Sequence, residues 1–285
     1  MAFINYLIHL AILVGIYSIL TVSLNLAVGF TGLLNLGHVG FFGIGAYTSA
    51  LLAVAGFPIW LSMIAGALLA GVSGILLALP TTRLKGDYLA LATLGFTFIM
   101  GSIARNWTDV TRGALGIPGI PKIVRGNVEF LIIVLIVAVV TYFVFWKISR
   151  SKFGKTCEAV RDDELAAKML GKDTFMHKIA ALGIGAFFAG IAGGLFAHYI
   201  TFIDPSIFGL GDLILLFSML VVGGLASVKG SAVGTIILFL LPEPLRFIGF
   251  PSSILGPARE IIFALILLLI LIYKPRGIFG KVDLA

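Results

Sequence analysis

The sequence predicts an all-α membrane protein: a polytopic bundle of about eight to ten membrane segments, forming one domain over residues 1–285. Hydrophobic residues make up 60% of the chain and charged residues 12%, and the mean hydropathy is +1.13. A soluble domain has about 25% charged residues. The first 82 residues contain no Asp, Glu, Lys or Arg, so a soluble fold built from them would have no charged surface.

Nine apolar stretches are expected to cross or enter the membrane, since about 20 residues of helix span its hydrocarbon core. They run over about 6–28, 33–55, 58–79, 87–104, 129–147, 178–200, 210–228, 231–248 and 257–273. The first has no preceding Lys or Arg, which favours a membrane span over a cleaved signal peptide. The net charge of +7 comes from basic residues that flank the apolar stretches, so it does not indicate nucleic-acid binding.

Charged residues gather in one stretch, 147–178, which holds 13 of the 33 charged side chains. We call it the charged stretch. Its eight Lys and Arg residues, and the basic C-terminal tail, are expected on the cytoplasmic side by the positive-inside rule. Asp204, Asp212 and the loop 105–128 then face outward, although the basic residues of that loop run against the rule. Counting back along the spans places the N-terminus outside, and a single re-entrant segment would reverse this.

Within this region the loop 148–177 is expected to contain a helix over about 157–170. Acidic residues lie early in it and Lys168 lies late, which suits the helix dipole, and Glu164 and Lys168 are a favourable i,i+4 pair. Gly171 fits the position that ends a helix. A solvated loop that only fixes topology is the alternative. The helix favours a docking role, because a plain connector needs only a few residues.

Two glycine-rich segments differ from ordinary spans. The segment 29–45 has six glycines, and the segment 223–234 is followed by Pro242-Glu243-Pro244. Inside a helix, Gly and Pro cost about 1 and 3 kcal/mol relative to Ala. Two explanations stay open: close packing of helices through small residues, or one broken or re-entrant helix in each half of the chain, lining a transport path. The glycines expected at the breaks are Gly29, Gly32, Gly37, Gly40, Gly223, Gly224 and Gly230.

Polar side chains in these segments are candidates for the path. Thr31, Asn35 and His38 lie in the first segment, and Glu243 follows the second. An ionisable group at membrane depth is a functional hypothesis by default. For His38 the alternative is a structural hydrogen bond between helices, and for Glu243 it is a structural pair with Arg246.

Several stretches resemble known permeases. LAAKMLG (165–171) is similar to the EAA-xxx-Gly element of ABC importer permeases, with Leu165 where that element has Glu. Longer stretches resemble the permeases of branched-chain amino acid importers, and the LivM-type subunit more than the LivH-type. They are SLNLAVGFTGLLNLGHVGFFGIGAYTSALLA (23–53), RLKGDYLALATLGF (83–96), GALGIPGIP (113–121), EAVRDDELAAKMLG (158–171) and GGLASVKGSAVGTIILFLLPEPLRF (223–247).

The resemblance implies a subunit of an ATP-driven importer of leucine, isoleucine and valine in the cell membrane. Its partners would be a homologous LivH-type permease, two cytoplasmic ATPase subunits and an external substrate-binding protein. ATP and Mg²⁺ would bind to the ATPases, and no cofactor to this chain. The residues implied in ATPase coupling are Glu158, Arg161, Asp162, Glu164, Leu165, Ala166, Ala167 and Gly171. Urea, amides or other small amino acids are alternative cargoes, and a stand-alone secondary transporter or channel is the alternative of another class.

Catalytic motifs are not expected in this chain. SRSKFGKT (149–156) lacks the leading glycine of a phosphate-binding loop and follows no predicted strand. The sequence has no His, Cys, Asp and Glu cluster with metal-ligand spacing and no nucleophile–base pair, so it predicts neither an enzyme nor a metal site.

Overall fold

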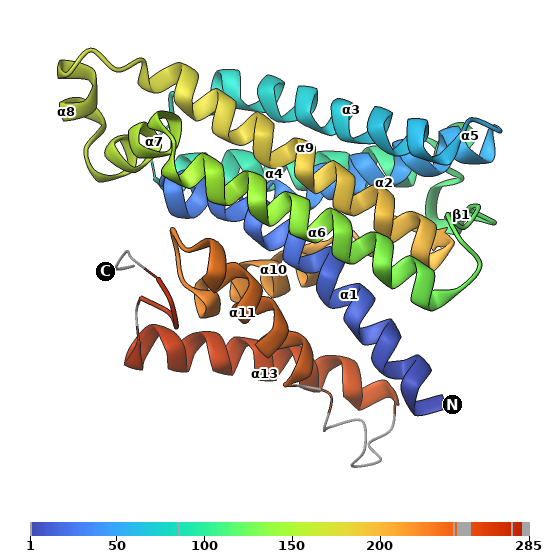
Figure 1. Cartoon of the computed structure of the whole chain (residues 1–285). Helices are drawn as coiled ribbons and strands as arrows, with labels where there is room; N and C mark the ends of the chain where they lie inside the picture. Colours follow the sequence, from blue (N-terminus) through green and yellow to red (C-terminus); the bar gives the residue numbers. More distant parts are fainter. Residues whose placement is uncertain (1, 85, 242, 244–251, 275, 281–285) are drawn as a thin grey trace.

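A computed structural model describes residues 2–84, 86–241, 243, 252–274 and 276–280. The fold is a helical membrane bundle, as predicted (Figure 1). Its longer helices are α1 (Ala2–Asn25), α2 (His38–Val54), α3 (Ile59–Thr81), α4 (Asp87–Asn106), α6 (Asn127–Arg150), α7 (Lys152–Asp162), α9 (Thr174–Ile200), α10 (Leu210–Gly223), α11 (Val228–Leu240) and α13 (Ser252–Tyr273). The short elements are the π-helix η1 (Leu26–Phe30), α5 (Thr108–Thr111), the 3-10 turn η2 (Gly113–Leu115), α8 (Glu164–Met169), and β1 (Ile117–Pro118) paired antiparallel with β2 (Phe202–Ile203).

Five helical stretches of the described chain are long and apolar enough to cross a membrane: Phe3–Phe30, Ile59–Thr81, Asp87–Asn106, Asn127–Arg150 and Thr174–Ile200. The apolar helices α2, α10 and α11 are shorter. This corrects three expected boundaries. The stretch 33–55 is helical only from His38, 210–228 ends its helix at Gly223, and 231–248 begins earlier, at Val228.

The core forms where α9 packs against α2 and α3 with little side chain between them. A Cβ atom on Gly45 would lie 2.3 Å from the backbone of Gly190, and one on Gly66 would lie 2.7 Å from the carbonyl oxygen of Gly45. Small residues let membrane helices approach this closely. Many glycines of this chain therefore serve close packing rather than helix breaking.

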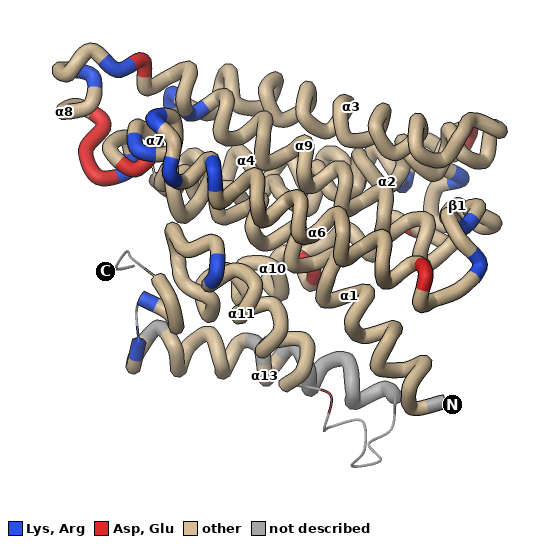
Figure 2. The backbone as a smooth tube through the Cα atoms, in the orientation of Figure 1, with Lys and Arg blue, Asp and Glu red and all other residues tan. Residues whose placement is uncertain are grey.

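The two halves of the chain interleave. The buried helix α1 packs against α10 and α11 of the second half, while α9 packs against α2 and α3 of the first. Figure 1 shows α1 and α9 running in opposite directions. Figure 2 shows most Lys and Arg positions near the ends of the bundle, with a dense group at α7 and α8. The β1–β2 ribbon and α5 lie at the opposite end.

Candidate functional site

The charged stretch forms two short helices, α7 and α8, and not the single helix expected over 157–170. Between them Asp163 has extended backbone (φ −155°, ψ 103°). Its carboxylate accepts hydrogen bonds from the N–H groups of Leu165 (2.8 Å) and Ala166 (3.0 Å). This is an N-cap arrangement. Asp163 therefore starts a new helix where the charge pattern predicts one that continues.

Helix α8 presents apolar side chains to solvent. Leu165, Met169 and Leu170 are 68%, 82% and 79% exposed, whereas Ala167 is buried. We call the three exposed residues the α8 surface. Gly171 ends the helix at φ +74°, and the bonds from Gly171 N to Lys168 O and from Lys172 N to Ala167 O form a Schellman cap. Exposed apolar side chains on a charged connector are typical of a protein-binding surface.

Glu164 fastens α8 to the start of α9. Its carboxylate contacts the ammonium of Lys168 at 3.0 Å and that of the buried Lys178 at 2.6 Å, and accepts a bond from the Thr174 hydroxyl at 3.2 Å. Partial burial alone would raise the pKa of Glu164. The hydrogen bonds and charges of Lys178 and Lys168 outweigh it and lower this pKa to about 2.

The ion pairs of Glu164 with Lys178 and Lys168 predict that the stability of the fold depends on pH. A carboxyl whose folded-state pKa is lowered stabilises the fold above its unfolded pKa, and that contribution is lost as pH falls from about 4.5 towards 2. We expect Glu164→Gln to lower the melting temperature at pH 7 and to flatten its decline between about pH 5 and 3. Thermal unfolding in detergent measures both effects. Glu129→Gln, an exposed carboxylate at the other end of the bundle, is the control; equal pH profiles for wild type and Glu164→Gln would contradict the assignment.

Helix α7 reaches the end of α1 through Arg161. The Arg161 guanidinium donates to the Gly29 carbonyl oxygen of the π-helix at 2.9 Å and contacts the Asp162 carboxylate at 2.8 Å. A Cβ atom on Gly32 would lie 2.8 Å from Arg161 Cγ. Glu158, on the same helix, pairs with its neighbour Lys155 at 2.8 Å. Arg161 thus joins the charged stretch to the π-helix η1, where the first glycine-rich segment begins. Such π-helical turns are frequent at functional sites.

The two glycine-rich segments meet at Asn25. Its amide nitrogen donates to Ser227 O (3.0 Å) and to the Ser231 hydroxyl (2.7 Å), and its amide oxygen accepts from Ala226 N (3.0 Å). Asn25 is fully buried. It therefore fixes the turn between α10 and α11 against the end of α1. Sequence analysis gave Asn25 no such role, since its partners lie about 200 residues away.

The second segment is interrupted at residues 224–227, between α10 and α11. Gly224 has φ +107°, and Cβ atoms on Gly223 and Gly230 would each strike the other residue's carbonyl group. The N–H groups of Ile278 and Phe279 donate to the carbonyls of Val222 and Gly223 at 3.0 Å. The interruption and the close packing thus occur together, and the C-terminal residues 276–280 pack on the same turn.

The first segment is interrupted over residues 31–37, within the stretch 29–45 where a broken helix was predicted. Gly32 has φ +71° and Gly37 precedes α2, but Gly40 lies inside α2, where it packs against Phe96. The Thr93 hydroxyl accepts a bond from Leu36 N, which holds the irregular backbone against α4.

The polar candidates of the first segment are buried among helices. The Thr31 hydroxyl donates to Leu26 O, and the Asn35 side-chain oxygen accepts from Gly37 N. The His38 Nε2 atom bonds the Ser23 hydroxyl at 2.8 Å. Each of the three candidates is at most 2% exposed, and Asn35 Nδ2 and His38 Nδ1 have no hydrogen-bond partner among the described residues. A place for these residues on a transport path stays a prediction.

Glu243 lies just beyond α11 and is half-buried. Its expected partner Arg246 and the two flanking prolines lie outside the described residues.

Comparison with known proteins identifies the family. The sequence model described as branched-chain amino acid transport system / permease component matches residues 6–272. The chain belongs to this family. It is similar to the high-affinity branched-chain amino acid transport system permease protein LivM of Escherichia coli K12, with 33% identity over 95% of this chain and 69% of that protein.

Two further relatives place the permease within the family. The probable LivM of Methanocaldococcus jannaschii is 29% identical over 94% of this chain and 91% of that protein. LivH of Escherichia coli K12 is 23% identical over 93% and 91%. The higher identity to LivM proteins assigns the permease to the LivM type, as the sequence motifs predict. Among solved structures, PsaBC from Streptococcus pneumoniae in complex with Fab aligns with a TM-score of 0.49 and 15% identity, which is too distant to add detail.

Asp212 corrects an expectation. It was predicted to face outward, but α10 begins inside the bundle. The Asp212 carboxylate accepts a hydrogen bond at 3.1 Å from the Tyr17 hydroxyl, near the middle of the stretch Phe3–Phe30. No local signal in the sequence indicated this depth, because Tyr17 lies 195 residues away from Asp212. A permease carboxylate at membrane depth is a functional candidate that sequence reasoning missed.

Cys157 has no accessible thiol. It packs in a cluster with Val22, Leu26 and Phe30, where α7 meets α1 and η1. Burial raises the pKa of this thiol to about 11, and the bond to the Thr31 side chain opposes the shift only in part. The residue acts as a small apolar side chain. Among the described residues, no three His, Cys, Asp or Glu side chains are grouped to hold a metal ion.

Proposed function

We propose that this chain is the membrane-spanning subunit of an ATP-driven ABC importer that passes branched-chain amino acids delivered by an external binding protein. The observation that carries the proposal is the charged stretch, which exposes the α8 surface and contacts Gly29 through Arg161, next to the Asn25 bonds that hold the 224–227 turn. In this reading the α8 surface docks on a cytoplasmic ATPase. The names of the LivM and LivH relatives support leucine, isoleucine and valine as the cargo.

The partner set follows from the same proposal. A LivH-type permease would complete the membrane part, and two ATPase subunits would bind ATP and Mg²⁺. This chain would then catalyse no reaction itself. Coupling would run from the α8 surface through Glu164 to α9, and from α7 through Arg161 to the end of α1.

Sidedness is part of the proposal. The charged stretch and residues 276–280 lie at the same end of the bundle. Residues 276–280 bond the backbone just before the 224–227 turn. The charged stretch bonds Gly29, four residues after Asn25, and Asn25 bonds the same turn. This favours a cytoplasmic location for both. The N-terminus, α5 and the β1–β2 ribbon would lie on the external side, where the binding protein delivers cargo.

The proposal is tested by co-expression with the neighbouring permease, ATPase and binding-protein genes, followed by reconstitution in proteoliposomes. We expect leucine-loaded binding protein to stimulate ATP hydrolysis and ATP-dependent leucine uptake. Leu170→Asp, on the α8 surface, should release the ATPases during purification, whereas Leu115→Asp, equally exposed at the other end, should not. Stimulation by urea alone would change the cargo. Uptake without any ATPase would overturn the proposal in favour of a secondary transporter or channel.

A further inference from the structure

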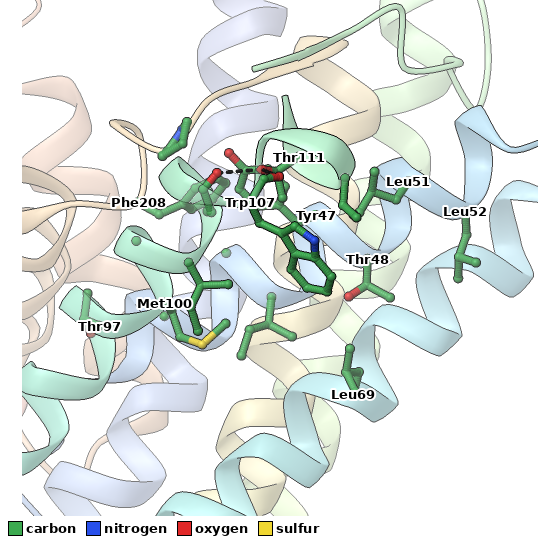
Figure 3. A pocket seen from close by; sticks show the side chains of 18 residues that line it. Tyr47, Thr48, Leu51, Leu52, Leu69, Thr97, Met100, Trp107, Thr111 and Phe208 are labelled. Atoms are coloured by element: carbon green, nitrogen blue, oxygen red, sulfur yellow. Dashed lines mark hydrogen bonds between the residues drawn. The ribbon is translucent and has the colours of Figure 1, made fainter. Parts of the chain in front are cut away.

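A cavity of about 360 Å³ opens between α2, α3, α4 and α5, at the end of the bundle opposite to the charged stretch (Figure 3). Its walls are formed mainly by aliphatic and aromatic side chains. Trp107, Met100, Leu51 and Phe208 are among them, and Figure 3 shows Trp107, Met100 and Thr48 around a common space. The volume falls in the range of small-ligand pockets, about 300–1,000 Å³. Walls of this kind suit an aliphatic group.

Tyr47 supplies a polar group in this apolar wall. The side chain lines the cavity and is 8% exposed, and its hydroxyl has no hydrogen-bond partner among the described residues. A buried hydroxyl left without a partner is unfavourable by about 1–3 kcal/mol. A ligand with a polar end would satisfy it, whereas the acyl chain of a membrane lipid would not.

Irregular backbone forms one side of the cavity. Residues 204–209 connect β2 to α10 inside the bundle, and Pro205 and Phe208 from this segment line the cavity. The Phe208 ring lies 5.7 Å from that of Tyr47 and packs on Gly43, where a Cβ atom would come within 3.2 Å of the ring. Non-helical backbone at membrane depth is tolerated where it lines a cavity, and interrupted segments mark binding sites in transporters.

We propose that this cavity receives the aliphatic side chain of the amino-acid cargo, with the Tyr47 hydroxyl bonding the cargo's polar end. This inference rests on the proposed function and adds a specificity site to it. The half-buried Asp204 directly precedes the lining residue Pro205, and its carboxylate accepts bonds from the N–H and hydroxyl groups of Ser206. An acidic residue at this position suits a cargo with an ammonium group. Leucine, isoleucine and valine combine these features: a branched aliphatic chain and a compact charged end.

Two glycines of α4 provide a matched test. Gly101 lines the cavity and Gly95 does not, and a Cβ atom at either position meets nothing within 4 Å. Leucine is favoured over glycine in a helix by about 1 kcal/mol, so neither substitution should unfold the protein. We expect Gly101→Leu to reduce leucine uptake by about tenfold or more and to shift preference toward alanine, because one methylene changes pocket discrimination by about 10–200-fold. Gly95→Leu should stay within about twofold of wild type.

Tyr47→Phe removes the hydroxyl without changing the shape of the wall. We expect it to raise the KM for leucine by about tenfold, in proportion to one lost hydrogen bond to a charged group. Wild-type KM values in both Tyr47→Phe and Gly101→Leu, with unchanged cargo preference, would overturn the inference.

Fluorescence of Trp107 gives a readout that does not depend on transport. In the full complex carrying Trp60→Phe and Trp146→Phe, Trp107 is the sole tryptophan of this chain; tryptophans of the partner subunits are replaced as well. Leucine should shift its emission, and Gly101→Leu should abolish the shift. Quenching by lipids with brominated acyl chains, without any response to leucine, would assign the cavity to bilayer lipid. If the wild-type complex imports no branched-chain amino acid, the proposed function fails. If it does import them and Gly101→Leu does so equally, only the cavity assignment fails.

Discussion

Replacing Gly29 with alanine is expected to destabilise this permease severely and to abolish uptake. A Cβ atom at this position would lie 1.9 Å from the side-chain oxygen of Asn25 and 2.4 Å from the backbone nitrogen of Ala226. The Asn25 side chain could rotate away, but only by losing its bonds to the 224–227 turn. The Ala226 backbone has no such freedom. Overpacking costs about 1–3 kcal/mol and an orphaned buried polar group about 1–3 kcal/mol, so we expect a loss of about 3 kcal/mol or more.

The melting temperature and the yield of assembled complex measure this effect. Gly95→Ala is the control, because it adds the same methyl group to a membrane helix at a site where a Cβ atom meets nothing within 4 Å. Wild-type melting and uptake in Gly29→Ala would show that the two interrupted segments are not held together at this point.

Composition is enough to predict the fold class, and apolar length locates most helices. Long stretches such as Ile59–Thr81 lie within a few residues of their expected bounds, because span length is set directly by membrane thickness. Apolar length could not predict that α2 begins only at His38. This start depends on Thr93 and Thr97 of α4, whose hydroxyl groups bond the backbone of Leu36.

The candidate site was predictable where the signal is local. Gly171 as a helix stop and the Glu164–Lys168 pair both depend on neighbours within a few residues. The break at Asp163 also had a local signal, since Asp is a preferred N-cap, but the run of acidic residues favoured one continuous helix.

Contacts between distant segments had no signal in a single sequence. Arg161 bonds Gly29 across 132 positions and Asn25 bonds Ser231 across 206. From its charge, Arg161 was predicted to lie in a water-exposed stretch. Its contact with the end of α1 could be seen only in the folded structure. The same applies to Asp212, whose depth follows only from the Tyr17 bond.

These contacts give a continuous route from the charged stretch into the membrane. Arg161 holds Gly29, Gly29 packs against Ala226 and Asn25, and Asn25 holds the turn on which residues 276–280 also pack. A displacement of α7 would therefore act on both interrupted segments at once. Coupling of this kind needs a contiguous set of contacts with more than one arrangement, and short irregular segments between helices offer that freedom.

Arg161→Ala is accordingly expected to uncouple ATP hydrolysis from transport. It removes a charge-assisted hydrogen bond of about 1.5–3 kcal/mol between α7 and the π-helix, so we expect uptake per ATP hydrolysed to fall by about tenfold or more. Arg161→Lys should recover only part of the loss, because an ammonium group lacks the planar fork that reaches both Gly29 O and the Asp162 carboxylate.

Arg150→Ala is the matched control, because it removes an exposed arginine at the same end of the bundle whose guanidinium stacks on Trp146. Uptake and ATP hydrolysis are measured together in proteoliposomes with leucine-loaded binding protein. The α8 surface stays intact in Arg161→Ala, so the ATPase subunits should co-purify as with wild type. Loss of the ATPases would assign Arg161 to docking instead, and an unchanged ratio of uptake to hydrolysis would remove it from the coupling route. If movement of α7 is transmitted to the membrane helices through the bond between Arg161 and the Gly29 carbonyl, the complex should assemble fully but show a reduced ratio of uptake to ATP hydrolysis.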